Sequence, residues 1–569
     1  MSLSLLAVLL CGLVADRIFE GLPHIEDEFA YAWQAAVIVK GRLTIPSPPH
    51  PKSFLIPFVV DYNGQRFGKY PPGWPIVLSL GVFLGVRFLV NPLLAGLGVW
   101  LTYLLGRRLF SEWVGVLAAG LTITSPFFLM NSGSLLSHPL GLVLSAVFAL
   151  AWLGVFFEKD SKSDKRANYK RWWATVAAAL SLWALILTRP FTAVGVALPF
   201  AIHGLGLFFR RDRSTRSRLL VLAGISLALA SLYFLWQYAV TGNALLNPYT
   251  LWWSYDKVGF GPGHGHLPEG HTLSHAYANT YYSLAAGARD LFGWGKYSWI
   301  FLPFGLWVAL RKDRWGPGRN WKALILFSVF LSLVLAHTLY WVGATLYGPR
   351  YYYESLYSLT LFSAAGIASL AGWRVSPSPF SGKSPSPAIG GEEVIIPPPK
   401  PGAEPAVGGD RVGDDQPLTS SNRLSRDRLN SREMPILKWF NVFSGRPKLR
   451  AGLIVSLLVG LMLYNLAVTL PARMREMQGL YGIQRSGLEP FVAAQAQGLA
   501  PALVFVHSEE WMPYGAFLDL EDPFLTTPII FAWSINPERD QEAAAVFPGR
   551  TVYQYYPEGN PWVLYKGWK

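Results

Sequence analysis

The sequence alternates between long apolar runs and short polar loops as far as residue 470. The runs are about 17–25 residues long, which is the length that a helix needs to cross a bilayer. Charged residues make up only 15% of the 569 residues, whereas soluble globular chains carry about 25%. The pattern predicts an α-helical polytopic membrane protein with about 11 spans, at residues 2–19, 87–106, 113–131, 134–157, 172–188, 190–209, 218–240, 297–310, 321–342, 351–372 and 450–470.

The basic residues decide the predicted orientation. The net charge is +14, but lysine and arginine cluster in short loops between spans, which is the positive-inside pattern and argues against a nucleic-acid surface. The apolar run from Trp74 to Gly85 has about a dozen residues and is too short to span. With this run at the membrane interface, every basic loop falls on the side of the N-terminus. We therefore predict a plasma (inner) membrane protein with a cytoplasmic N-terminus, an exported C-terminus and no nucleic-acid partner.

Composition divides the chain into four regions. The stretch 373–448 is rich in Pro, Ser, Gly and Arg, cannot bury a core, and is predicted to be a disordered cytoplasmic loop. Short β-rich runs at 502–506, 528–532 and 551–556 follow a predicted helix at 487–498, which is typical of a small α/β domain. The predicted regions are a transmembrane core with its first exported loop at 20–86, the cytoplasmic loop, a last span and an exported α/β domain, at residues 1–372, 373–448, 449–470 and 471–569.

Two adjacent carboxylates, Asp27 and Glu28, stand just after the first predicted span. The apolar residues from Phe29 to Val39 recur at helical spacing and predict an amphipathic helix at the interface. A carboxylate pinned at that point can act as general base toward an acceptor hydroxyl or amine. The alternative is that both are solvated interfacial charges. We predict that Asp27 and Glu28 are catalytic, and His24 is a possible substrate contact.

The segment Phe67-Gly-Lys-Tyr-Pro-Pro-Gly-Trp-Pro75 precedes the short apolar run. Its prolines and glycine hold the backbone extended, so that Lys69 and Tyr70 present a cation and a hydroxyl at the depth of the lipid headgroups. Such groups suit a phosphate, and we predict that both bind one. A lysine that snorkels to the interface beside aromatic residues is the alternative.

Arg350 enters a hydrophobic helix with no other lysine or arginine near it in sequence. A charge inside a bilayer is costly and needs a partner or a function, and an arginine can hold a phosphate with two parallel hydrogen bonds. The alternative is an internal salt bridge to Glu354 or Asp27. Arg189 lies between two apolar runs on the outer side, and the same reasoning applies to it. We predict that both arginines bind a phosphate.

Three further residues are possible substrate contacts. Arg87 begins the second span and is placed to pair with an interfacial carboxylate. His138 begins another span on the outer side, where the alternative is a hydrogen-bonded structural histidine. Tyr351 directly follows Arg350.

The predicted loop at 241–296 is rich in metal-binding residue types: Asp256, His264, His266, Glu269, His271 and His275. The H-x-H and H-x3-H spacings invite a zinc site, but the glycines around them leave such ligands without a preorganised arrangement. We favour a flexible loop that orders over bound substrate. No cofactor is predicted, and a divalent metal is possible but not favoured. The sequence lacks G-x4-G-K-[ST], H-E-x-x-H and G-x-S-x-G, which argues against nucleotide hydrolysis and common protease chemistries.

These motifs resemble those of the C-type (GT-C) integral-membrane glycosyltransferases. The shared features are the Asp27-Glu28 pair in the first exported loop, Tyr70-Pro-Pro-Gly-Trp-Pro75 before a short helix, Leu104-Leu-Gly-Arg-Arg-Leu-Phe110 and Thr188-Arg-Pro190. The branch to which the chain is most similar comprises the protein O-mannosyltransferases and the bacterial transferases that put aminoarabinose on lipid A. The resemblance covers about residues 1–370 and implies the GT-C fold.

The resemblance also implies a reaction. Such enzymes move a hexosyl or pentosyl group, with inversion, from a polyprenyl-phosphate carrier to a lipid, glycan or protein acceptor on the exported face. In the family the first acid of the pair lies at the acceptor, which implies that Asp27 is the general base and Glu28 its neighbour. The cations at the donor phosphate correspond to Lys69 and Arg350. The insert after Gly372 lies outside the family pattern.

Two other functions stay open. A transporter or flippase of lipid-linked sugars also needs outward cations and an amphipathic entrance, but it should show charged or broken positions at mid-span and internal repeats. Here the notable charges lie at span exits and no repeat is evident. A non-catalytic assembly or receptor protein would use the exported tail instead.

Overall fold

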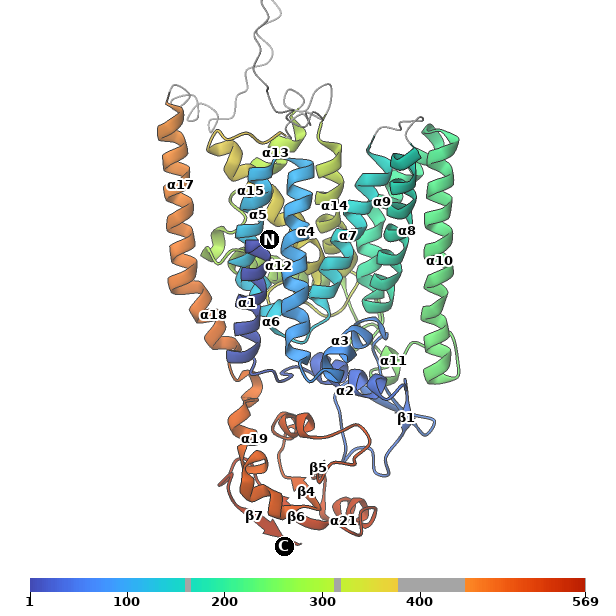
Figure 1. Ribbon diagram of the computed structural model, residues 1–569. Helices are drawn as coiled ribbons and strands as arrows, with labels where there is room; N and C mark the ends of the chain where they lie inside the picture. The colour runs from blue at the N-terminus through green and yellow to red at the C-terminus, as the bar shows by residue number, and fades with distance from the viewer. Residues whose placement is uncertain (159–164, 312–318, 377–445, 568–569) are drawn as a thin grey trace, which may run out of the picture. The chain divides into compact units, whose positions relative to one another are not determined.

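The computed structural model describes residues 1–158, 165–311, 319–376 and 446–567 (Figure 1). Contacts between residues divide the chain into two units: Met1–Pro377 with Ala451–Lys569, and Ser378–Arg450, which lies almost entirely outside the described residues. The candidate site and the elements that build it belong to the first unit. The predicted disordered loop at 373–448 lies almost entirely outside the described residues.

Helices dominate the described residues. The α-helices are α1 (Ser2–Arg17), α2 (Glu26–Val39), α3 (Gly73–Phe83), α4 (Val90–Leu109), α5 (Glu112–Ile123), α6 (Pro126–Gly133), α7 (His138–Phe156), α8 (Lys165–Thr188), α9 (Pro190–Arg210), α10 (Arg213–Thr241), α11 (Tyr249–Trp252), α12 (Leu273–Asp290), α13 (Leu302–Leu310), α14 (Trp321–His337), α15 (Leu356–Leu370), α17 (Pro447–Tyr464), α18 (Leu470–Met477), α19 (Arg485–Val492), α20 (Trp511–Gly515) and α21 (Pro537–Ala545). The tighter or wider helical turns are η1 (Arg87–Leu89), η2 (Gly295–Tyr297), η3 (Arg350–Ser355), η4 (Asn465–Thr469), η5 (Leu480–Gly482), η6 (Ala494–Leu499) and η7 (Ala516–Leu520). The strands are β1 (Ile45–Pro46), β2 (Val59–Tyr62), β3 (Gln65–Gly68), β4 (Ala502–Val506), β5 (Ile529–Trp533), β6 (Thr551–Tyr555) and β7 (Leu564–Lys566).

Six of the described helices are long and apolar enough to cross a membrane, or seven if one bent pair counts as a span. The six are Arg87–Leu109, His138–Phe156, Lys165–Thr188, Pro190–Arg210, Arg213–Thr241 and Pro447–Gly482. Other predicted spans correspond to shorter helices, since α1 has 16 residues, α13 has 9 and α15 has 15. The total of about 11 spans therefore stays a prediction.

The predicted span at 113–131 is two helices rather than one. α5 and α6 meet at an angle of 62°. Pro126 has no N–H to continue the hydrogen-bond ladder, and Ser125 caps the new helix by accepting from the N–H of Phe128 at 3.2 Å. The side-chain amide of Asn465 donates to the carbonyl oxygen of Thr124 at 2.7 Å. The break is therefore stabilised by a residue from the far end of the chain.

The helix α15 is buried along its whole length, because small residues let a neighbour touch its backbone. A Cβ on Gly305 of α13 would lie 1.8 Å from the carbonyl oxygen of Phe362, and one on Gly366 would lie 2.2 Å from that of Phe301. The two helices are thus in backbone contact. This packing holds η3, which leads into α15 and begins with Arg350, against the body of the protein.

The basic turns and the first loop lie at opposite ends of the helical bundle. Figure 1 shows the C-terminal ends of α4 and α9 at one end, and α2, α3 and α11 at the other. The first end carries Arg107 and Arg108 of α4 and Arg210 of α9.

The first loop contains α2, α3 and a small antiparallel sheet with the strand order β1-β3-β2. Phe29, Tyr31 and Trp33 on α2 are all buried, so this helix is enclosed on more than the single apolar face that its sequence predicts. A Cβ on Gly73, at the start of α3, would lie 2.6 Å from the backbone of Leu187. Only glycine fits there, and the contact brings the Lys69 segment next to Arg189.

The C-terminal segment forms a four-stranded sheet with the order β5-β4-β6-β7, in which the first three strands are parallel. The predicted strands are strands in the structure, and β4 has the predicted bounds. The predicted helix at 487–498 is α19 followed by η6. One apolar cluster joins Phe491 and Phe517 of this segment to Leu22 and Phe29 of the first loop.

Candidate functional site

A cavity of about 410 Å³ opens among segments that are far apart in the sequence. Small-molecule sites have volumes of about 300–1,000 Å³. Six of the ten predicted site residues line it: Asp27, Lys69, Tyr70, Arg189, Arg350 and Tyr351. Its walls are largely aromatic and include Tyr31, Phe58, Tyr249, Trp253, Tyr340 and Trp341. The cavity therefore combines apolar walls with converging charges.

Asp27 lies in the first turn of α2, where the N-terminus of a helix favours a negative charge. The hydroxyl of Tyr70 donates a hydrogen bond of 2.7 Å to its Oδ1. Nη1 of Arg350 lies 3.7 Å from its Oδ2, and 21% of the Asp27 side chain stays exposed. Burial raises the pKa of Tyr70, so this hydroxyl stays a donor. A carboxylate that is oriented by two neighbours and still open to a ligand has the geometry of a general base.

Glu28 does not line the cavity and is completely buried. Its Oε2 accepts from the N–H groups of His24 and Ile25 at 2.8 and 3.2 Å, and its Oε1 accepts from the N–H of Leu135 at 2.6 Å. Burial raises the pKa of Glu28 to about 7, and the three N–H donors oppose this rise. The carboxylate thus ties the start of α2 to the turn between α6 and α7. In this geometry Glu28 holds Asp27 in place and does not face a ligand.

Lys69 is a buried cation directly after β3. Its Nζ lies 3.3 Å from Oδ2 of Asp256, and its side chain is 4% exposed. The ammonium also lies 3.5 Å from the ring centre of Phe58 and 4.9 Å from that of Trp253, within reach of cation–π attraction. Burial lowers the pKa of Lys69, and the charge of Asp256 opposes this. The side chain is enclosed and does not snorkel.

Arg350 begins η3 at the cavity wall. Among the described residues its Nη1 has no hydrogen-bond partner, although the carboxylate of Asp27 is near. The next ring, Tyr351, stacks on His337 with centres 5.0 Å apart, and the guanidinium carbon of Arg350 lies 5.6 Å from the centre of that tyrosine ring. Of the two salt bridges considered from the sequence, the structure contains the one to Asp27. Arg350 therefore lines the cavity with a guanidinium that is paired with Asp27 and is not fully hydrogen-bonded.

Arg189 and His138 share one buried carboxylate, that of Glu354. Nε of Arg189 lies 3.0 Å from Oε1 of Glu354, and Nδ1 of His138 lies 3.2 Å from the same oxygen. Arg189 also donates to the hydroxyl of Ser137 at 3.1 Å. Arg189 lines the cavity, whereas His138 lies behind it. The geometry around His138 is that of a hydrogen-bonded structural residue.

Gly141 of α7 leaves room for Glu354. A Cβ at this position would lie 2.8 Å from Cγ and from Oε1 of Glu354. We expect Gly141→Ala to displace that carboxylate and to destabilise the protein by about 1–3 kcal/mol, as overpacking does. Gly120→Ala in α5 is the control, because nothing lies within 4 Å of its Cβ and alanine is better than glycine in a helix by about 0.5–1 kcal/mol. Equal shifts in the midpoint of thermal unfolding in detergent would contradict this packing.

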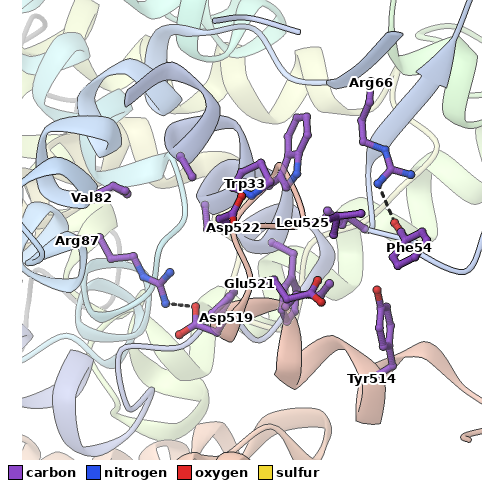
Figure 2. A pocket seen from close by; sticks show the side chains of 17 residues that line it. Trp33, Phe54, Arg66, Val82, Arg87, Tyr514, Asp519, Glu521, Asp522 and Leu525 are labelled. Carbon is purple, nitrogen blue, oxygen red and sulfur yellow. Dashed lines mark hydrogen bonds and ion pairs between the residues drawn. The ribbon is translucent and has the colours of Figure 1, made fainter. Parts of the chain in front are cut away.

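Arg87 lies at a second, smaller cavity of about 80 Å³ on another side of α2. Figure 2 shows its guanidinium directed at Asp519 of the C-terminal segment, with which it forms an ion pair. It also donates to the carbonyl oxygen of Gly21 at 3.0 Å. Arg87 therefore pairs with a carboxylate, as its position in the sequence suggests, and links the start of the second predicted span to the C-terminal segment.

His24 is completely buried and lines neither of these cavities. Its Nδ1 lies 3.0 Å from the carbonyl oxygen of Leu22, and its ring packs edge-on against Phe19 with centres 5.5 Å apart. The main-chain N–H of His24 is one of the three that donate hydrogen bonds to the Glu28 carboxylate. The structure places His24 in the support of α2.

The segment predicted as a loop at 241–296 contains the helix α12, in which His275 lies. The rings of His271 and His275 stack with centres 6.5 Å apart, and the other contacts of these histidines are to different parts of the chain. Nε2 of His271 lies 2.9 Å from the carbonyl oxygen of Thr338, and its ring stacks on Phe260. His266 packs edge-on against Trp341. No group of three or more His, Cys, Asp or Glu side chains is placed to hold a metal in the part of the chain that the structure describes. The low expectation for a metal stays a prediction.

Two carboxylates that the sequence patterns do not mark as binding residues, Glu26 and Asp256, also line the cavity. Glu26 lines the cavity one residue before Asp27, and burial raises its pKa. Asp256, considered only as a metal ligand, accepts from the hydroxyl of Tyr340 at 2.8 Å and from Nε1 of Trp341 at 3.2 Å besides pairing with Lys69. It lies 187 positions from Lys69. No local pattern could reveal that pairing.

Among solved structures, the chain is similar to ArnT from Cupriavidus metallidurans. The apo form matches with a TM-score of 0.52 and 14% identity over 97% of this chain and 92% of ArnT. The form bound to undecaprenyl phosphate matches with a TM-score of 0.50 and the same identity and coverage. The apo oligosaccharyltransferase from Archaeoglobus fulgidus has a TM-score of 0.48 and 11% identity, over 97% of this chain and 69% of that chain. No family model and no curated protein matches the sequence. The likeness to ArnT confirms the predicted GT-C fold.

Proposed function

We propose that the protein is a glycosyltransferase that moves a sugar from a polyprenyl-phosphate donor to an acceptor on the exported face of a membrane. The observation that carries the proposal is the placement of Asp27 and Arg350 3.7 Å apart on one cavity. A base for the acceptor and a cation for the donor phosphate then face the same space. The fold supports this donor class, because ArnT has been crystallised with undecaprenyl phosphate.

In the proposed reaction, Asp27 accepts the proton of an acceptor O–H or N–H while that atom attacks the anomeric carbon of the sugar. The bond from this carbon to the phosphate oxygen breaks, and its electron pair leaves with the polyprenyl phosphate. Attack opposite the leaving group inverts the configuration. Arg350, with Lys69 and Arg189 on the same cavity, stabilises the departing phosphate electrostatically. Tyr70 keeps the carboxylate of Asp27 oriented through its hydrogen bond.

A groove between α9 and α14 supports a lipid-linked donor. It has a volume of about 540 Å³, and its apolar lining includes Leu198 and Ile202 of α9 and Leu331 and Leu335 of α14. The ends of the same two helices line the cavity through residues 190–192 and His337. A polyprenyl chain that left the cavity between these helices would find an apolar path.

The proposed orientation has a cytoplasmic N-terminus, with the cavity and the C-terminal segment on the exported side of the plasma (inner) membrane. Its support is the positive-inside bias, because the basic turns lie at the end of the bundle opposite α2. The sugar, whether hexosyl or pentosyl, and the acceptor, whether a lipid, glycan or protein, are left to experiment.

The direct test is to identify, by mass spectrometry, the lipid that co-purifies with the protein and to assay transfer from that lipid. We expect a polyprenyl phosphate or its sugar ester, and transfer of the sugar to an added acceptor. Recovery of bulk phospholipid alone, together with no transfer from any polyprenyl-phosphate sugar, would overturn the proposal.

We expect Asp256→Asn to weaken donor binding at alkaline pH, so that the variant loses binding at a lower pH than the wild type. The carboxylate of Asp256 raises the pKa of Lys69 against the effect of burial. Its removal lowers that pKa further, so Lys69 loses its proton, and the phosphate its cation, at a lower pH. The measurement is the Kd of undecaprenyl phosphate between about pH 6 and pH 10. Glu269→Gln, an exposed change in the same loop, should leave the alkaline limb where it is. If Asp256→Asn loses binding at the same alkaline pH as the wild type, Lys69 does not contribute to binding of the phosphate.

A further inference from the structure

A buried arginine of the C-terminal segment reaches the loop that precedes Arg350. Arg473 lies in α18 and is 4% exposed. Its Nη2 donates a hydrogen bond of 3.0 Å to the carbonyl oxygen of Leu346, and its Nε lies 3.2 Å from Oδ1 of Asp290. A buried guanidinium keeps such partners, because leaving one would strand a charge in a medium of low polarity.

The helix α12 braces the same loop from another direction. Asp290, its last residue, is completely buried and pairs with Arg289 at 2.8 Å as well as with Arg473. One turn earlier, a Cβ on Gly287 would lie 3.3 Å from Cγ of Pro349. The helix therefore contacts Pro349, next to Arg350, with the same end that fixes Arg473.

The three residues between Leu346, which Arg473 contacts, and Arg350 have little freedom. The carbonyl oxygen of Tyr347 accepts from the side-chain amide of Asn131 at 2.9 Å. Gly348 has φ +70°, and a Cβ there would lie 2.7 Å from the ring of Phe127. Because the stretch is short and its backbone has little freedom to absorb a shift, a displacement at Leu346 is passed on to Arg350.

We propose that Arg473 is a positioning residue for Arg350, so that the C-terminal segment sets the geometry of the donor-phosphate subsite. The inference rests on the proposed role of Arg350 toward that phosphate. Nη1 of Arg350 has no hydrogen-bond partner among the described residues and lies 3.7 Å from Asp27. Its position therefore depends on the backbone that carries it, and Arg473 is one of the residues that hold this backbone.

The test compares Arg473→Met with Arg475→Met, which removes an exposed guanidinium from the same helix. The readouts are the Kd of undecaprenyl phosphate in detergent, hydrogen exchange of the main-chain amides at 346–353, and the thermal midpoint. We expect Arg473→Met to weaken binding by about 10- to 100-fold, the effect of misplacing a reacting or binding group by about 1 Å, and to speed exchange at 346–353. The control variant should change neither.

A double-mutant cycle separates positioning from general loss of structure. In an Arg350→Met background, Arg473→Met should weaken binding no further, because the group on which it acts is absent. If Arg473→Met does not fold, Arg473→Lys replaces it: the shorter cationic head keeps a charge toward Asp290 but cannot reach Leu346 at the same time.

Unchanged exchange at 346–353 in a folded Arg473 variant would overturn the inference. The inference would also be overturned if Arg473→Met lowered the affinity for undecaprenyl phosphate equally in the presence and absence of Arg350. If the wild-type protein binds no undecaprenyl phosphate while exchange at 346–353 responds to Arg473, the donor proposal fails and the hold of Arg473 on the loop stands.

Discussion

Asp27→Asn will abolish sugar transfer and leave polyprenyl-phosphate binding intact. A positioned general base contributes about 10²–10⁴-fold to a rate, and asparagine keeps the shape of the side chain but cannot take a proton. Binding should be unchanged or tighter, because the substitution removes a negative charge that lies 3.7 Å from Arg350 and repels the phosphate. The measurements are kcat with the identified donor and the Kd of undecaprenyl phosphate.

Asp16→Asn is the matched control for this experiment. Asp16 lies near the end of α1 and pairs with Arg485 at 3.2 Å, away from the cavity, so transfer by this variant should be that of the wild type. If the protein were a transporter, it would catalyse no transfer, and Asp27→Asn would lower the flux of lipid-linked sugar. If it were a scaffold, Asp27→Asn would affect neither transfer nor flux. Full transfer by Asp27→Asn would rule out its role as base.

Arg350→Met will weaken donor binding more than any other single change at the cavity. The pair at stake is the proposed one between Arg350 and the donor phosphate. Loss of one partner from a buried, hydrogen-bonded charge pair costs about 2–5 kcal/mol, which is roughly 30- to 4,000-fold in Kd. Undecaprenyl phosphate affinity should fall by an amount in that range, and transfer should fall with it. Arg350→Lys should recover part of the loss, because it restores the charge without the planar fork that binds two oxygens.

Lys296→Met provides the control for charge alone. Lys296 is exposed and lies in η2, outside the cavity, so its removal lowers the net charge by the same amount without touching the site. A loss of affinity as large in this variant as in Arg350→Met would mean that the phosphate senses only the overall field of the protein.

Local patterns in the sequence predict local structure well here. The strand β4 follows from a short run of β-formers between turn residues, and that information is contained in neighbouring positions. The break after α5 escapes the same reasoning, because hydropathy averaged over a span does not register one Ser-Pro step inside it. Ser125 and Pro126 are the residues that indicate the start of a new helix, but the apolar residues on both sides keep the average hydropathy high.

The candidate site shows where adjacency in sequence misleads. Asp27 and Glu28 read as a catalytic pair, yet successive residues on an α-helix project about 100° apart. One therefore faces the cavity while the other binds three main-chain N–H groups. Because a buried charge needs a partner, the sequence predicts two alternative salt bridges for Arg350, and the one with Asp27 is formed. That of Lys69 with Asp256 depends on how distant loops fold back, which no local spacing encodes.

The apolar cluster shared by Phe29 and Phe491 has a consequence for biosynthesis. Translation at roughly 5–20 residues per second separates the emergence of these two rings by about 20–90 s. During that interval the surface of α2 that the C-terminal segment later covers is bare. Ribosome-bound chains of this protein must therefore be guarded against self-association until their last hundred or so residues arrive.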